Sequence, residues 1–114
     1  MMNISDLREK TNDYFSDVEY IPMDEIIDQD IGIMDAVTFE NKDGTPTAAF
    51  KFARLDASGN ITEDVYKTTT HAGPIVDMLA KGEVADLLYA GEIIGARVVE
   101  KKSKKSGRTY RTFA

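Results

Sequence analysis

The pattern of apolar and polar positions changes along the chain. In the first twenty or so residues, apolar side chains are isolated among polar and acidic ones, which indicates a short helix or a loose arm. From residue 31 onward, β-branched and aromatic residues are concentrated in segments bounded by turn sequences, which predicts strands. The three strand segments are IGIMDAVTFE at 31–40, TAAFKFARL at 47–55 and ITEDVYKTTTH at 61–71.

The periodicity becomes helical after His71. In AGPIVDMLAKG, Pro74 suits the first position of a helix and Gly82 suits its end, so the spacing predicts a helix over 74–81. Strand character returns in EIIGARVVE at 92–100. The loop KKSKKSG at 101–107 then leads to a final predicted strand, RTYRTFA, at 108–114.

Three strands, one helix and two further strands predict a mainly β protein with one principal helix. This order favours a five-stranded Greek-key barrel of the OB type, with the helix between strands three and four. A length of 114 residues fits one such domain. We expect the barrel to span residues 24–114 and residues 1–23 to form an acidic N-terminal arm or a short helix outside it.

Composition excludes several functional classes. The chain has no cysteine, so it contains no disulfide scaffold, no zinc finger and no thiol nucleophile. The first ten residues lack the apolar core of a signal peptide, and no run of 18 apolar residues could span a membrane. A cytoplasmic location without membrane association is therefore the expectation.

Charge is distributed very unevenly. The chain carries a formal net charge of −6, yet residues 101–114 hold six of its 14 Lys and Arg and no Asp or Glu. A lysine run by itself is often only a solvated loop. Here it lies beside Tyr110 and Phe113, and proteins that bind single strands combine backbone-tracking charge with rings on which bases stack.

Side-chain alternation refines this picture. Tyr110 and Phe113 fall on opposite faces of an extended strand, so at least one of them is expected in the core. Phe50 and Phe52 share a face and are expected in the core, which leaves Lys51 on the other face. The candidate phosphate contacts are Lys101, Lys102, Lys104, Lys105, Arg108 and Arg111, with Tyr110 as the stacking ring. Second-tier nucleic-acid candidates are Lys51, Lys67 and Arg97.

No motif indicates catalysis. His71 is the single histidine and has no evident catalytic partner in the sequence; a residue satisfied by backbone hydrogen bonds is the simpler interpretation. The acidic residues of 24–30 lack the loop spacing and the glycine of a calcium site, so they indicate a solvated face. No phosphate-binding glycine motif is present. We therefore expect a protein that is not an enzyme and that needs no metal or cofactor.

The segments YKTTTHAGPIVDMLAKGE and IIGARVVEKKSKKSGRTYRTF resemble the C-terminal half of phage-type single-stranded DNA-binding proteins with OB-folds. MDEIIDQDIGIMDAVTFENKDGTPTAAFKF resembles their opening strands, so the resemblance covers about residues 24–114. It implies non-catalytic binding of single-stranded DNA in replication or recombination. The chain has no Trp, so Tyr and Phe would provide the stacking. The loop ENKDGTP is poor in positive charge, which leaves the hairpin as the main electrostatic element.

Two other functions stay open. One is an OB-like protein-interaction or assembly module whose acidic surface meets a basic partner. Another is an accessory subunit of a nuclease or recombinase. Expected partners are single-stranded DNA, replication or recombination proteins that contact the acidic N-terminal segment, and further copies of the chain. An exposed ring near the hairpin would favour DNA binding, whereas a buried Tyr110 and Phe113 would favour the interaction module.

Overall fold

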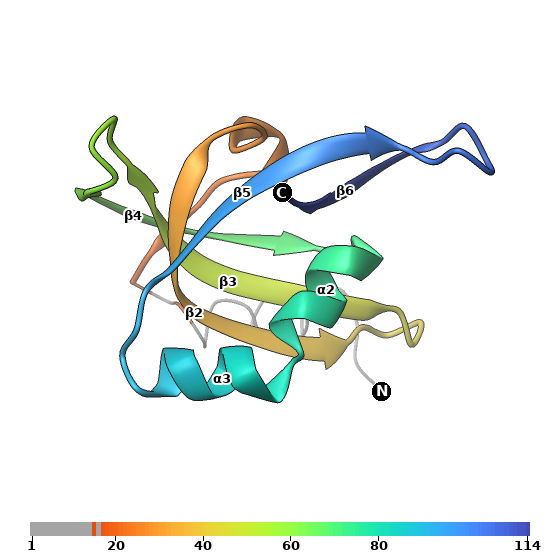
Figure 1. Ribbon diagram of the computed structural model, residues 1–114. Helices are drawn as coiled ribbons and strands as arrows, with labels where there is room; N and C mark the ends of the chain where they lie inside the picture. Colours follow the sequence, from red (N-terminus) through yellow and green to blue (C-terminus); the bar gives the residue numbers. More distant parts are fainter. Residues whose placement is uncertain (1–14, 16) are drawn as a thin grey trace.

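The computed structural model describes residues 15 and 17–114, and strands dominate it (Figure 1). The expectation of a mainly β protein is confirmed. In chain order the elements are β1 (Glu19–Tyr20), the 3-10 turn η1 (Met23–Glu25), β2 (Asp30–Glu40), β3 (Pro46–Leu55), β4 (Ile61–Thr70), α2 (Gly73–Leu79), α3 (Gly82–Tyr89), β5 (Ile94–Lys102) and β6 (Thr109–Phe113). Neither helix has the length and apolar character needed to cross a membrane.

The strands form one open six-stranded sheet in the order β1-β4-β3-β2-β5-β6. This differs from the expected closed barrel of five strands, since no pairing joins β4 to β6 in the described part of the chain. Two short helices also replace the single expected helix. Lys81 adopts an extended conformation between them, so Gly82 begins α3 and does not simply end the preceding helix.

Strand β2 lies inside the sheet, between β3 and β5, and pairs with both. It runs antiparallel to β3 along its length and antiparallel to β5 over residues 30–33. The register with β3 shifts between Ile33 and Asp35, which is typical of a bulge that bends a strand. At Gly32 a Cβ atom would come within 2.8 Å of the Ile93 side chain, so a larger residue at this position would require that side chain to shift.

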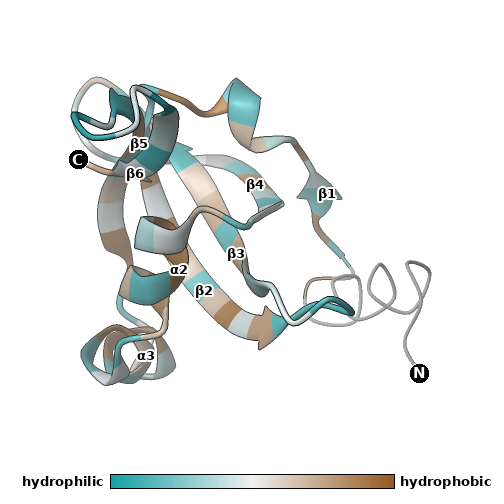
Figure 2. Cartoon of the chain, turned by 90° about the vertical axis from the view of Figure 1, so that its right-hand side faces the viewer, coloured by the Kyte–Doolittle hydropathy of each residue, from teal (hydrophilic) through white to brown (hydrophobic). Residues whose placement is uncertain are grey.

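The core lies between the inner face of the sheet and α2. Phe50 and Phe52 are completely buried, as their shared face predicted, and their ring centroids are 5.6 Å apart. Ile75 and Leu79 of α2 pack into the same core. Figure 2 shows the alternation of apolar and polar positions along β2 and β3 that this one-sided burial requires.

Residues 19–28, here called the strap, connect the edge of β4 to β5. At one end β1 pairs in parallel with β4, and the Ile21 amide donates to the Lys67 carbonyl at 3.0 Å. At the other end the Asp28 amide donates to the Val98 carbonyl at 2.8 Å. The strap passes over the gap between β4 and β5 (Figure 2). Its buried side chains are Ile21, Met23 and Ile26.

The structure places part of the predicted N-terminal arm against the sheet. Phe15 is buried, as are Ile21 and Met23 of the strap. The other residues of the arm, 1–14 and 16, lie outside the described residues, so the domain boundary before residue 24 stays a prediction. Ile21 and Met23 belong to the same apolar cluster as residues of the sheet, so the described part of the arm packs against the core.

Candidate nucleic-acid interface

The basic segment forms the hairpin of β5 and β6, which extends beyond the rest of the sheet (Figure 1). Its turn is closed by the Ser103 amide donating to the Arg108 carbonyl at 2.8 Å, and by the Gly107 amide donating to the Ser103 carbonyl at 2.9 Å. Gly107 has φ of 70°, a conformation that favours glycine. The Ser-Gly sequence therefore provides the turn, and the lysines on either side of Ser103 are carried to its tip.

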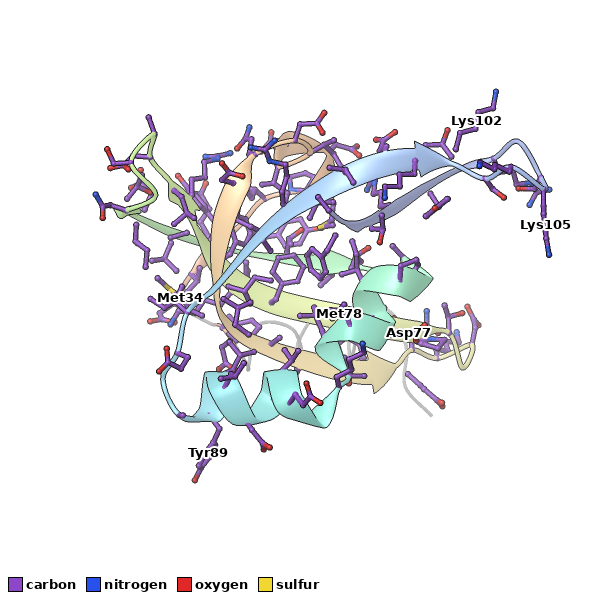
Figure 3. All side chains as sticks on the ribbon, in the orientation of Figure 1. Met34, Asp77, Met78, Tyr89, Lys102 and Lys105 are labelled. Carbon is purple, nitrogen blue, oxygen red and sulfur yellow. The ribbon has the colours of Figure 1, made fainter. Side chains whose placement is uncertain are left out.

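Five of the candidate cations lie on this hairpin with their side chains exposed. None of them forms an ion pair with any residue of the described chain. They are Lys101, Lys102, Lys104, Lys105 and Arg108. Figure 3 shows Lys102 and Lys105 projecting from the hairpin into the surroundings. The hairpin thus presents a concentrated positive charge, and within the described residues no ion pair neutralises these five side chains.

The strand register divides the remaining hairpin side chains between two faces. Lys101 lies opposite Tyr110, while Glu100 lies opposite Arg111 on the other face. The Tyr110 side chain is 40% exposed. Phe113 is partly buried and packs against the core, as expected for one of the two rings. One face of the hairpin base therefore offers a cation and an accessible ring together.

Two candidate arginines are already engaged by carboxylates. The Arg111 guanidinium donates to the Asp24 carboxylate in the strap and lies 3.9 Å from Glu100. Arg97 donates to Asp30 at 2.8 Å. The hydrogen bond from Arg97 lowers the pKa of the Asp30 carboxyl below its ordinary value. These arginines therefore differ from the free lysines at the hairpin tip.

The second-tier lysines are not displayed for phosphate binding. Lys67 is only 5% exposed, and its ammonium donates to the Phe15 carbonyl at 3.1 Å. This corrects the expectation that Lys67 is a nucleic-acid contact. Lys51 lies opposite Lys67 and is half-buried. Ala49 and Ala53, on the same outer face, are completely buried, so this face of β3 and β4 is covered.

An open cleft of about 600 Å³ lies between the β4–α2 connection and the β5–β6 hairpin. Its lining residues are Thr70, His71, Ala72, Gly73, Pro74, Glu100, Thr109, Tyr110 and Arg111. His71 is exposed, and its Nδ1 is 2.9 Å from the Thr47 hydroxyl, so a side chain and not the backbone satisfies it. The cleft thus combines the Arg111 cation, the rings of His71 and Tyr110 and threonine hydroxyl groups with the Glu100 carboxylate. These groups suit a polar ligand with a flat part and with an anionic part that binds Arg111.

Sequence reasoning identified the hairpin but not the cleft or the role of Asp24. The acidic residues of 24–30 were expected to form a solvated face, and the Asp24 and Asp30 side chains are 75% and 53% exposed. Each of these two carboxylates also forms an ion pair, which the sequence did not indicate. Arg111 and Asp24 are separated by 87 positions, and no local pattern marks such a pair. Within residues 15 and 17–114, no three His, Asp or Glu side chains are grouped as metal ligands would be.

Comparisons with known proteins do not place the chain in a family. No family model matches it, and neither the curated proteins nor the solved structures give a significant match.

Proposed function

We propose that this protein binds single-stranded DNA without strong sequence preference and without catalysis. The observation that carries the proposal is the hairpin, whose five exposed cations form no ion pair within the described residues and lie beside the accessible ring of Tyr110. Because the phosphates are the same in every DNA sequence, contacts between these cations and phosphates contribute equally to the affinity for all sequences. The resemblance to phage-type single-strand binders supports a role in replication or recombination.

The strand connectivity agrees with this proposal. Strands β2, β3 and β4 form an antiparallel meander, the helices follow, and β5 returns to the other edge of β2 with β6 beside it. We interpret this as an OB-type barrel that is open between β4 and the β5–β6 hairpin, with the strap reaching from β4 to β5. In OB-folds the loops after the first and fourth strands flank the nucleic-acid site.

These two loops contribute unequally here. They correspond to the β2–β3 turn and the β5–β6 turn, which lie on the same side of the molecule in Figure 1. The β2–β3 turn carries Lys42 beside Glu40 and Asp43, so its charges largely cancel. The hairpin therefore provides most of the attraction for phosphates, and the covered outer face of β3 and β4 provides little.

Fluorescence anisotropy with labelled oligo-dT tests the proposal. We expect binding that weakens as salt rises, because phosphate neutralisation releases counterions. The double variant Lys104→Ala/Lys105→Ala is expected to bind more weakly. Lys42→Ala/Lys81→Ala makes the same change of net charge at exposed positions outside the hairpin, and is expected to retain most of the affinity. Equal losses in the two variants would argue against a site on the hairpin.

A protein-interaction module is the second candidate, and the surface of α3 favours it. Tyr89 is 96% exposed and points away from the body of the protein (Figure 3). Leu87 is 48% exposed, and the acidic Glu83 and Asp86 lie on the same helix. Such a surface suits a partner segment with basic and apolar side chains. This function takes the lead if the protein does not bind oligo-dT.

A further inference from the structure

We infer that Arg111 forms a phosphate subsite at the cleft, and that the Asp24 carboxylate occupies this subsite when DNA is absent. The inference rests on the proposed function and specifies how its site is regulated. Among the described residues that line the cleft, Arg111 is the one Lys or Arg, and Tyr110 precedes it on β6. Lys102 and Arg111 fall on the same face of the hairpin, so a strand bound along that face would reach Arg111 at the hairpin base.

Asp24 is held in position by its neighbours and is itself accessible. Met23 and Ile26 of the strap are buried in the core, which anchors the η1 turn, and Asp24 of this turn forms its ion pair with Arg111 of β6. The Asp24 side chain remains 75% exposed, while the Arg111 side chain is 32% exposed. The Arg111 side chain is therefore the less exposed of the two partners, and the Asp24 carboxylate lies on the solvent side, where an incoming anion arrives.

A phosphate can replace this carboxylate at low cost. Both groups present oxygens to the planar fork of a guanidinium, and arginine binds either of them in the same way. Exposed ion pairs are weak, because water and salt screen them. Glu100, at 3.9 Å from the guanidinium, adds a second negative charge but no close hydrogen bond. Asp24 is thus the group that a phosphate must displace.

The competition predicts a specific effect of removing the Asp24 charge. Asp24→Asn weakens the internal competitor and makes Arg111 more available, so we expect oligo-dT affinity to rise about two- to fivefold. Asp28→Asn is the matched control, because it removes the same charge from the same strap. Asp28 is exposed and has φ of 64°, which asparagine tolerates. It forms no close ion pair in the described chain, and its charge acts only at longer range, on Arg97. We expect it to raise the affinity less.

The experiment is a set of anisotropy titrations with labelled oligo-dT at one low salt concentration. The proteins are the parent, Asp24→Asn, Asp28→Asn, Arg111→Gln and the double variant Asp24→Asn/Arg111→Gln, each checked for folding by urea denaturation. The inference predicts that Asp24→Asn raises the affinity for oligo-dT more than Asp28→Asn does. In the Arg111→Gln background, Asp24→Asn is expected to raise the affinity no more than Asp28→Asn does in the parent. Equal gains in the two single variants, or an undiminished gain without Arg111, would overturn this inference alone. If the parent does not bind oligo-dT, the proposed function fails and the inference fails with it.

Discussion

Lys101 and Tyr110 lie directly opposite each other across the β5–β6 pair, so a cation and an exposed ring project from the same face of the hairpin base. Cross-strand partners of this kind are close enough to contact one ligand together. A nucleotide has a phosphate for the cation and a flat base for the ring. The pair therefore connects the electrostatic and stacking parts of the proposed site.

Replacing Tyr110 with alanine tests the stacking contribution. If a base stacks on the ring, Tyr110→Ala is expected to weaken oligo-dT binding by about 1–3 kcal/mol while the salt dependence stays nearly unchanged. Tyr89→Ala is the control, because it removes a more exposed ring from α3, distant from the hairpin. Anisotropy titrations at several salt concentrations measure both quantities. Equal affinities of the parent and Tyr110→Ala would remove this ring from the site.

We predict that replacing Thr68 with valine stabilises the protein. Thr68 is completely buried, and in the described residues its Oγ1 has no hydrogen-bond partner. Thr68→Val removes this unsatisfied group with little change of shape, so we expect the free energy of unfolding to rise by about 1 kcal/mol. Thr70→Val is the matched control on the same strand, because Thr70 Oγ1 accepts from the Ala72 amide at 3.1 Å. It is expected to destabilise the protein. Urea denaturation distinguishes these effects, and a loss of stability in Thr68→Val would contradict the reasoning.

Replacing Phe15 tests how much this buried side chain contributes to the stability of the fold. Its side chain is 3% exposed, so Phe15→Ala is expected to lower the free energy of unfolding by about 3–5 kcal/mol. Tyr20→Ala, at a position 48% exposed, is expected to cost far less. Thermal and urea unfolding followed by circular dichroism measure both. Similar small effects of the two substitutions would show that Phe15 does not contribute to the core.

The ion pair of Asp30 and Arg97 predicts a dependence of stability on pH. The hydrogen bond from Arg97 lowers the pKa of Asp30 in the folded protein, so its contribution is present above the ordinary pKa of about 3.8. The contribution is lost as the pH falls below that value, through the lowered pKa. The stability difference between the parent and Asp30→Asn is therefore expected to be constant near neutral pH and to shrink below about pH 4. Urea titrations at a series of pH values measure it. A difference that persists unchanged at the lowest pH would contradict the assignment.

The sequence predicted the local features of this protein better than the long-range ones. Alternation placed Phe50 and Phe52 in the core, and turn residues placed the hairpin tip near Gly107, because both signals are local. The sequence did not predict the strap, because the strap is defined by long-range contacts of residues 19–28 with β4 and β5. The burial of Lys67 was missed for the same reason, since its partner Phe15 is 52 positions away. Within the site, exposed lysines follow from composition, whereas the pairing of Arg111 with Asp24 depends on tertiary structure.

The central claim is that the hairpin lysines contact the DNA backbone. Its most direct test is the salt dependence of oligo-dT binding by the parent and by the variant with Lys101, Lys102, Lys104 and Lys105 all replaced by alanine. If about three to four phosphates are neutralised, log K of the parent falls against log salt with a slope of about −2 to −3. The fourfold variant is expected to bind more weakly and with a flatter slope. An unchanged affinity and an unchanged slope would show that the lysines form only a solvated loop, and would contradict the claim.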